Sequence, residues 1–304
     1  MWTSTDVVEE LRRRGEVWEE RPGLTGLRGP PLALLGRIER LLAGLAREAS
    51  CPEWRLPPGL TLRTLARARY FESFPQWLTA AGHLSDDPDV LESLARSGDP
   101  ARAAAGSVGA AECALSPALC YHTYARLAGS TVDAVRMSAH GTCWRHEGDR
   151  TAPLERGWAF TMHELVLVGR PDEVDAFRRA GMDVARALAR SLGLEHEIVE
   201  ATDPFFAPTA RGRALLQRIK SLKHELLLPL GEGRTVAAAS FNDHERFFGD
   251  AFAIRLRDGT PAASGCVAFG VERWLLAFLV AHGPDVARWP RTRARLAAPA
   301  GRAS

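Results

Sequence analysis

The chain has 304 residues, of which 46% are apolar, 25% charged and 8% aromatic, which predicts a globular protein and excludes a fibrous or disordered one. Its formal net charge of +2 does not indicate a nucleic-acid partner without a local basic patch. The longest apolar run near the C-terminus, residues 275–281, is far shorter than a membrane span, and the N-terminus carries no secretion signal, so we expect a cytoplasmic protein without a membrane partner.

The first hundred residues are predicted to be mainly helical. Apolar residues at helical spacing predict helices over 6–14 and 31–49, and the second follows a Gly-Pro-Pro opening. Prolines between 50 and 60 end that helix. Because no repeat and no long low-complexity linker marks a boundary, we interpret residues 1–304 as a single domain with a mainly helical N-terminal part over about 1–100.

From residue 134 onward the pattern changes to short segments rich in β-branched and aromatic residues, which predict strands. The predicted strands are 139–144, 158–168, 197–200, 235–241, 252–257 and 265–269. Helices are predicted over 172–192, 210–228 and 271–281. Short turns such as 257–259 favour an antiparallel sheet with helices packed on it, an α+β fold, and the absence of GxGxxG and GxxxxGK[ST] disfavours a doubly wound nucleotide fold.

A first patch of chemically active residues runs from 142 to 164. It contains Arg145, Glu147, Arg156, Phe160 and Glu164, on two predicted strands joined by a polar loop. Guanidinium groups bind phosphate oxygens bidentately and an aromatic ring stacks on a base, so this combination suits a nucleoside triphosphate. On these residues alone, a solvated hairpin with surface ion pairs remains an alternative.

A second patch, residues 264–274, is a strand that turns at glycine into an apolar helix. Arg273 falls in the first turn of that helix. An anion at the N-terminus of that helix would contact the free backbone N–H groups of the first turn and also the guanidinium of Arg273. A strand–helix junction with a surface arginine is the alternative.

The two patches, in this order, resemble motifs 2 and 3 of class II aminoacyl-tRNA synthetases. Residues 144–147 match FRxE, with Trp144 in place of phenylalanine, and residues 270–273 match GxER. The resemblance is greatest to atypical, zinc-dependent seryl-tRNA synthetases and, among them, to their truncated relatives, the amino acid:[carrier protein] ligases. It covers roughly residues 60–283 and implies the class II fold, an antiparallel sheet flanked by helices.

The resemblance implies one zinc ion per chain, held by Cys120, Glu164 and Cys266. Two thiolates and a carboxylate leave the fourth tetrahedral position open, as in a substrate-binding zinc site, where the amino group of an amino acid could bind. The sequence spacing itself carries no local metal signature. A rival cluster of His140, Cys143 and His146 therefore remains open at this stage.

The resemblance also implies an ATP site. The matching positions are Arg145, Glu147, Arg156, Gly157, Phe160, Lys223, Ala237, Ala238, Ala239, Ser240 and Arg273. Arg145 and Arg273 are the implied catalytic residues: Arg145 would bridge the α-phosphate and the substrate carboxylate, and Arg273 would face Phe160 across adenine. Mg²⁺ is implied as well, although Val236 and alanines occupy the positions of its usual ligands.

The implied reaction is activation of glycine or alanine to an aminoacyl-adenylate, followed by transfer to the phosphopantetheine thiol of a carrier protein. The implied assembly is a homodimer. Because the first hundred residues show neither heptads nor basic runs, we expect no tRNA-binding domain and no tRNA partner. A minimal seryl-tRNA synthetase paralogue acting on another acceptor, or a non-catalytic sensor of adenylate or amino acid, remains an alternative.

An insertion relative to ordinary seryl enzymes, residues 207–229, is predicted to bind the carrier protein. Its apolar residues recur at helical spacing, and its other flank carries Arg211, Arg213, Arg218 and Lys220. Carrier proteins of this kind are acidic, so a cationic helix would steer them. An amphipathic helix with a merely solvated basic face is the alternative.

Overall fold

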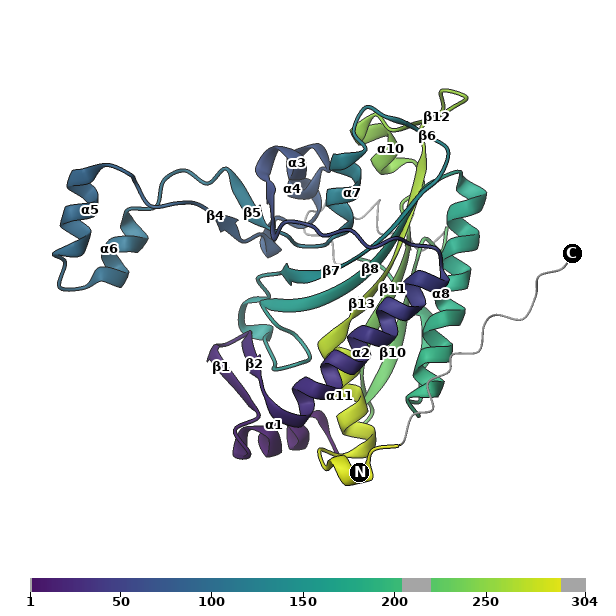
Figure 1. Cartoon of the computed structure of the whole chain (residues 1–304), viewed down its shortest axis with the longest axis horizontal. Coiled ribbons are helices and arrows are strands. Elements are labelled where there is room, and N and C mark those ends of the chain that lie inside the picture. Colours follow the sequence, from purple (N-terminus) through teal and green to yellow (C-terminus); the bar gives the residue numbers. More distant parts are fainter. Residues whose placement is uncertain (1, 204–219, 291–304) are drawn as a thin grey trace, which may run out of the picture.

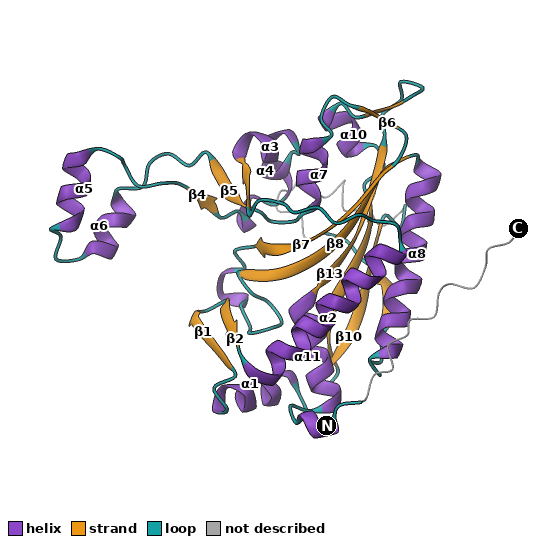
Figure 2. Cartoon of the chain, viewed as in Figure 1, coloured by secondary structure: helices purple, strands orange, loops and turns teal. Residues whose placement is uncertain are grey.

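The computed structural model describes residues 2–203 and 220–290, and its centre is a twisted antiparallel sheet (Figure 2). The sheet has six strands in the order β7-β8-β13-β11-β10-β9. Their bounds are β7 (Val135–Trp144), β8 (Ala159–Gly169), β9 (Glu197–Glu200), β10 (Lys223–Gly231), β11 (Arg234–Asp243) and β13 (Ala263–Gly270). Every neighbouring pair is antiparallel, as the sequence predicts.

One face of the sheet is covered by α2 (Gly29–Glu48), α8 (Pro171–Ser191) and α11 (Val271–His282). The other face carries α7 (Cys120–Arg126), α3 (Leu62–Arg67) and α10 (Phe247–Phe252). Successive side chains of a strand point to opposite faces. Accordingly, Leu165 and Leu167 pack under the first group of helices, whereas Val166 and Cys266 face α7.

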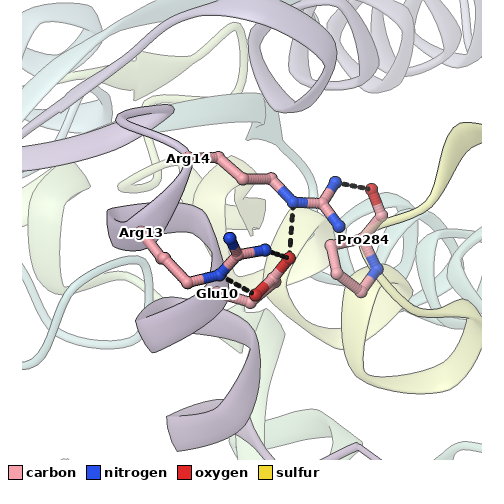
Figure 3. Close-up of polar contacts among 4 residues, drawn as sticks. All are labelled: Glu10, Arg13, Arg14 and Pro284. Atoms are coloured by element: carbon pink, nitrogen blue, oxygen red, sulfur yellow. Dashed lines mark hydrogen bonds and ion pairs between the residues drawn. The ribbon is translucent and has the colours of Figure 1, made fainter.

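The N-terminal segment folds as α1 (Ser4–Arg13) followed by a hairpin of β1 (Val17–Arg21) and β2 (Leu24–Leu27). Figure 3 shows how α1 is joined to the chain after α11: Arg14 Nη1 donates to the carbonyl oxygen of Pro284 at 3.2 Å. Glu10 holds both Arg13 and Arg14, and these guanidinium groups lower the pKa of Glu10 to about 2. The helix is therefore fixed against the C-terminal end of α11.

A small sheet of β3 (Gly59–Thr61), β5 (Cys113–Leu115) and β4 (Ala80–Ala81) supports a helical arm that projects from the molecule (Figure 1). The arm consists of α5 (Pro88–Ala95) and α6 (Pro100–Gly106). Its two connecting segments meet again at an antiparallel bridge between Leu84 and Val108. The remaining short elements are α4 (Tyr70–Ser73), β6 (Thr131–Val132), β12 (Arg255–Leu256) and the 3₁₀ turns 75–77, 148–150 and 286–288.

Most predicted elements are confirmed, but two predictions are wrong. Residues 252–257 form only the end of α10 and the two-residue strand β12, which pairs in parallel with β6. The predicted helix 210–228 overlaps β10 from residue 223 on, while residues 210–219 lie outside the described part. Leu226, Leu228 and Leu230 are buried at a period of two, so this segment follows the strand pattern rather than the helical one.

Within residues 2–203 and 220–290, no helix combines the length and the apolar character that a membrane span requires.

Candidate active site

A cavity of about 940 Å³ lies on the α7 face of the sheet, and every described residue predicted to bind ATP or metal lines it. These residues come from α7, β8, β10, β11, β13, the loop between β7 and β8, and the start of α11. They are Cys120, Arg145, Glu147, Arg156, Gly157, Phe160, Glu164, Lys223, Ala237, Ala238, Ala239, Ser240, Cys266 and Arg273. The fold therefore brings segments far apart in the sequence to one chamber.

Cys120, Glu164 and Cys266 form a compact cluster at one end of this cavity. Their ligand atoms all lie within 4.8 Å of one another, and all three residues are buried. Cys120 begins α7, while Glu164 and Cys266 lie on neighbouring strands, where Glu164 pairs with Ala268. Cys266 is two residues from Ala268, so it shares the face of Glu164.

The carboxylate of Glu164 is held in place from the start of α7. Its Oε2 accepts hydrogen bonds from the backbone N–H groups of Leu119 and Cys120, both at 2.9 Å. Contact with Cys266, burial and the negative charge of Glu164 raise the pKa of the Cys120 thiol well above its usual value. A bound divalent cation would instead favour the negatively charged forms of these three groups, because metal ions bind thiols in their deprotonated form. The donor set thus fits a zinc ion.

The alternative metal cluster of His140, Cys143 and His146 is wrong. His140 Nε2 lies 3.2 Å from Glu39 Oε1, and Cys143 is fully buried. His146 instead packs edge-on against the ring of Trp158. Residues 140 and 143 are separated by an odd number of positions on β7, so their side chains leave opposite faces of the sheet.

Arg145 is clamped in a fixed direction at the end of β7. Its Nε donates to the carbonyl oxygen of Pro117 at 3.0 Å. Its guanidinium carbon lies 5.4 Å from the ring centroids of both Trp77 and Phe160. These contacts leave the terminal Nη groups for an anion in the cavity, and the cation–π contacts restrict the rotamer of the side chain.

The loop between β7 and β8 supplies a second arginine to the cavity. Arg156 Nη1 lies 3.1 Å from Glu147 Oε2, and Glu147 is 8% exposed. Glu147 also lies near Arg150. The alternative of a solvated hairpin is therefore wrong for Glu147, which is buried, whereas Arg156 lines the cavity with a side chain that is 38% exposed.

Arg273 lies half-buried under the same loop. Its Nε donates to the carbonyl oxygen of Glu155 at 2.7 Å and its Nη1 to that of Ala237 at 2.8 Å. Burial first, and then the charges of Arg156 and Arg145, lower the pKa of Arg273 to about 10. The group stays charged at neutral pH, and the mutual repulsion of three guanidinium groups favours an anion among them.

Lys223 begins β10 and does not lie in a helix. Its Nζ contacts Asp203 Oδ1 at 2.7 Å and Glu225 Oε1 at 2.8 Å. Burial alone would lower the pKa of Lys223, but these carboxylates raise it above the usual value. Its contact with a phosphate remains a prediction.

Two residues beside the cluster were not identified from the sequence. Asn242 Nδ2 donates to Cys266 Sγ at 3.4 Å, and His244 Nε2 lies 3.9 Å from the same sulfur. His244 Nδ1 lies 3.1 Å from the hydroxyl of Tyr124, and burial lowers the pKa of His244 to about 4, so the ring is neutral at neutral pH. The alternation of Ser240 and Asn242 on β11 with His244 directly after it was the signal for a polar strand face.

Most of the predicted carrier-binding helix lies outside the described residues. This applies to Arg211, Arg213 and Arg218. Lys220 is described, and its Nζ contacts Glu245 Oε1 at 2.7 Å on the exposed surface.

Several curated proteins have sequences similar to that of this chain. Amino acid–[acyl-carrier-protein] ligase 1 of Bradyrhizobium diazoefficiens is 35% identical over 83% of this chain and 79% of its own length. Amino acid–[acyl-carrier-protein] ligase 2 of the same organism is 37% identical over 83% of this chain and 77% of its own length. The type-2 serine–tRNA ligase of Methanopyrus kandleri is 29% identical over 94% of this chain but only 58% of its own length. No family model matches the sequence.

Solved structures give the same relationship. Seryl-tRNA synthetase of M. kandleri, crystallised with a tRNA, superposes with a TM-score of 0.86 at 26% identity, over 96% of this chain and 60% of that one. Prolyl-tRNA synthetase of Giardia lamblia, with prolyl-adenylate, gives a TM-score of 0.70 at 12% identity and shows the class II fold alone. At 35% and 37% identity to the two Bradyrhizobium proteins over most of both lengths, the chain belongs to the family of amino acid–[acyl-carrier-protein] ligases, truncated relatives of the type-2 seryl-tRNA synthetases.

Proposed function

We propose that this AMP-forming ligase activates glycine or alanine with ATP and transfers the aminoacyl group to the phosphopantetheine thiol of a small carrier protein. The observation that supports this most directly is the shared cavity, which is lined by both a buried Cys-Glu-Cys cluster and three arginines. A carboxylate attacking a phosphate needs positive charge there. The names of the two Bradyrhizobium ligases support a carrier protein as the acceptor. We extend the proposal to a homodimer that does not act on tRNA.

In this proposal Cys120, Glu164 and Cys266 hold one zinc ion per chain. When bound, the ion supplies an open coordination position for the neutral amino group of the substrate. Asn242 and His244 flank Cys266 Sγ and orient it, since groups behind a metal ligand fix its geometry. An acid that lacks an amino group should therefore be a poor substrate.

The arginines have separate roles in the proposed reaction. Arg145 bridges the substrate carboxylate and the α-phosphate, where its contact strengthens as charge develops on the phosphate oxygens. Arg156 and Gly157 bind the far phosphates, with Glu147 beside them to position ATP. Arg273 and Phe160 enclose the adenine, and Mg²⁺ enters with the nucleotide.

The walls around the cluster support a small substrate side chain. Behind Cys266 the rings of Tyr124 and Phe248 are stacked with centroids 4.0 Å apart, and His244 packs edge-on against Phe248 at 5.0 Å. Phe248 and His244 also line the cavity, so these rings form part of its wall beside the cluster. Accommodating a longer side chain would require displacing close-packed rings, which costs stability.

We expect amino-acid-dependent pyrophosphate exchange, scanned over all twenty amino acids, to respond to glycine or alanine. Glycolate, which has a hydroxyl in place of the amino group of glycine, should give no exchange, because it lacks the neutral nitrogen donor. Exchange with a large amino acid alone would contradict the proposed specificity. If the chain aminoacylates tRNA but does not aminoacylate a phosphopantetheinylated carrier, the proposed acceptor is wrong.

The proposed carrier site is the basic flank formed by Arg211, Arg213, Arg218 and Lys220. Charge reversal by Arg211→Glu and Arg218→Glu should leave pyrophosphate exchange intact and abolish transfer to an acidic carrier, because attraction becomes repulsion. Single-turnover transfer at two salt concentrations measures this, since screening weakens such an interaction. The matched control is reversal of Arg179 on α8, which should change neither reaction. Unchanged transfer in the double variant would reject this site.

A further inference from the structure

The loop that carries Arg156 is held at one residue from two sides. Arg234 Nη2 contacts both carboxylate oxygens of Glu155 at 2.8 Å. From inside the cavity, Arg273 Nε donates to the backbone oxygen of the same residue at 2.7 Å. Glu155 immediately precedes Arg156 and Gly157, so its position determines where these two residues lie.

Arg234 is itself attached to the fixed N-terminal helix. It begins β11, directly after the tight turn from β10, and its Nη1 donates to Ser4 Oγ at 2.9 Å. Ser4 is buried at the start of α1, and Arg14 at the other end of that helix binds the carbonyl of Pro284 (Figure 3). The guanidinium of Arg234 thus connects the loop to a helix that cannot easily shift.

The N-terminal hairpin holds the same loop at its other end. The carbonyl oxygen of Gly23 accepts hydrogen bonds from the backbone N–H groups of Trp158 at 2.8 Å and Ala159 at 3.2 Å. The guanidinium carbon of Arg21 lies 4.5 Å from the ring centroid of Trp158. Residues that come from outside the motif-bearing strands therefore define both flanks of Arg156 and Gly157.

The loop needs such support because its backbone is not relaxed. Leu154, directly before Glu155, has φ of +63°, a left-handed conformation that a side chain such as leucine rarely adopts. Strained residues persist only where their surroundings hold them. A Glu155 carboxylate without Arg234 would also be free to turn toward Arg273 or Arg156 and compete with phosphate oxygens.

We propose that Arg234 is a positioning residue for ATP: it holds Glu155 outward so that Arg156 and Gly157 are placed for the phosphates. Arg234 does not line the cavity and matches none of the implied ATP-binding positions. The inference rests on the proposed function in one respect, that ATP binds in this cavity.

The test is steady-state pyrophosphate exchange in the full chain. Arg234→Ala should raise KM for ATP about tenfold. In this variant the loop that carries Arg156 would become ordered only when ATP binds, and part of the ATP-binding energy would be used to order it. The value of kcat at saturating ATP and KM for the amino acid should stay within about twofold, since bound nucleotide restores the loop. A merely structural role would lower kcat and the melting temperature without this split.

Further variants separate the contact from general damage. Glu155→Gln should raise KM for ATP similarly, and the double variant should be no worse than either single variant, because both remove one interaction. Arg234→Lys, which keeps the charge, should give an intermediate KM. Arg257→Ala is the matched control: it removes an exposed pair with Asp133 at the opposite end of the molecule and should leave KM unchanged.

Calorimetric measurement of the binding of a non-hydrolysable ATP analogue distinguishes a failure of the proposed function from a failure of the inference about Arg234. If the wild-type chain does not bind the analogue, the proposed function fails and the inference with it. If the wild type binds and Arg234→Ala binds equally well, the inference alone is overturned. Additive effects of Arg234→Ala and Glu155→Gln would overturn it as well, whereas weakened, non-additive binding supports it.

Discussion

Replacing Cys266 with serine should remove the bound zinc and reduce amino-acid activation by more than about 100-fold. Loss of a residue that merely hydrogen-bonds a metal ligand already lowers metal affinity or activity by about 10–100-fold, and Cys266 is a proposed ligand itself. The side chain is 4% exposed on β13, next to Cys120 and Glu164. Serine has nearly the same shape, but its hydroxyl is far less acidic than a thiol and is a poor zinc ligand. We therefore expect the fold to persist while the site is lost.

Zinc content by mass spectrometry, pyrophosphate exchange and thermal melting measure these effects. Wild-type protein should contain about one zinc per chain, as expected of a single tetrahedral site. Cys113→Ser is the matched control, because Cys113 is exposed and lies outside the cluster. Stoichiometric zinc in a Cys120→Ser, Cys266→Ser double variant would refute the assignment of these ligands.

Arg145→Ala should lower the rate of adenylate formation by about 10²–10³-fold, the usual cost of removing one preorganised charge-stabilising donor. ATP binding should weaken much less, because this contact is strongest when charge develops on the α-phosphate. Arg273→Ala should instead raise KM for ATP, since this half-buried guanidinium belongs to the proposed adenine enclosure.

Rapid measurement of adenylate formation, together with equilibrium ATP binding, separates the two variants. Arg179→Ala is a suitable control because Arg179 is exposed on α8, forms an ion pair with Asp175 of the same helix and is not among the residues that line the cavity. If Arg145→Ala and Arg273→Ala both retain near wild-type exchange, the assignment of the two arginines is wrong.

The elements that the sequence predicts well have strong periodicity of their own. Helix α8 and strand β8 lie within a few residues of their predicted bounds, because each buries one continuous apolar pattern. Lys223 shows the opposite case. The leucines of its segment fit both the helical period and the alternating period of a strand. The segment forms a strand because it pairs with β9 and β11.

The metal cluster could not be derived from spacing. Cys120, Glu164 and Cys266 are brought together by the antiparallel register of β8 with β13 and by the start of α7, and this is tertiary information. Only the resemblance to a known family named them in advance. Arg234 and Gly23 carry no motif either, because they act on the loop through a carboxylate and a backbone oxygen.

The projecting arm of α5 and α6 has a consequence for how this chain can change in length. Ala81 and Cys113 are direct partners across β4 and β5, so the excursion between them leaves and re-enters the molecule at one point. Closing such a short gap requires little chain entropy. The arm is therefore a modular appendage: its length and sequence are free to vary, or to be replaced by a tight turn, without altering the register of the catalytic sheet.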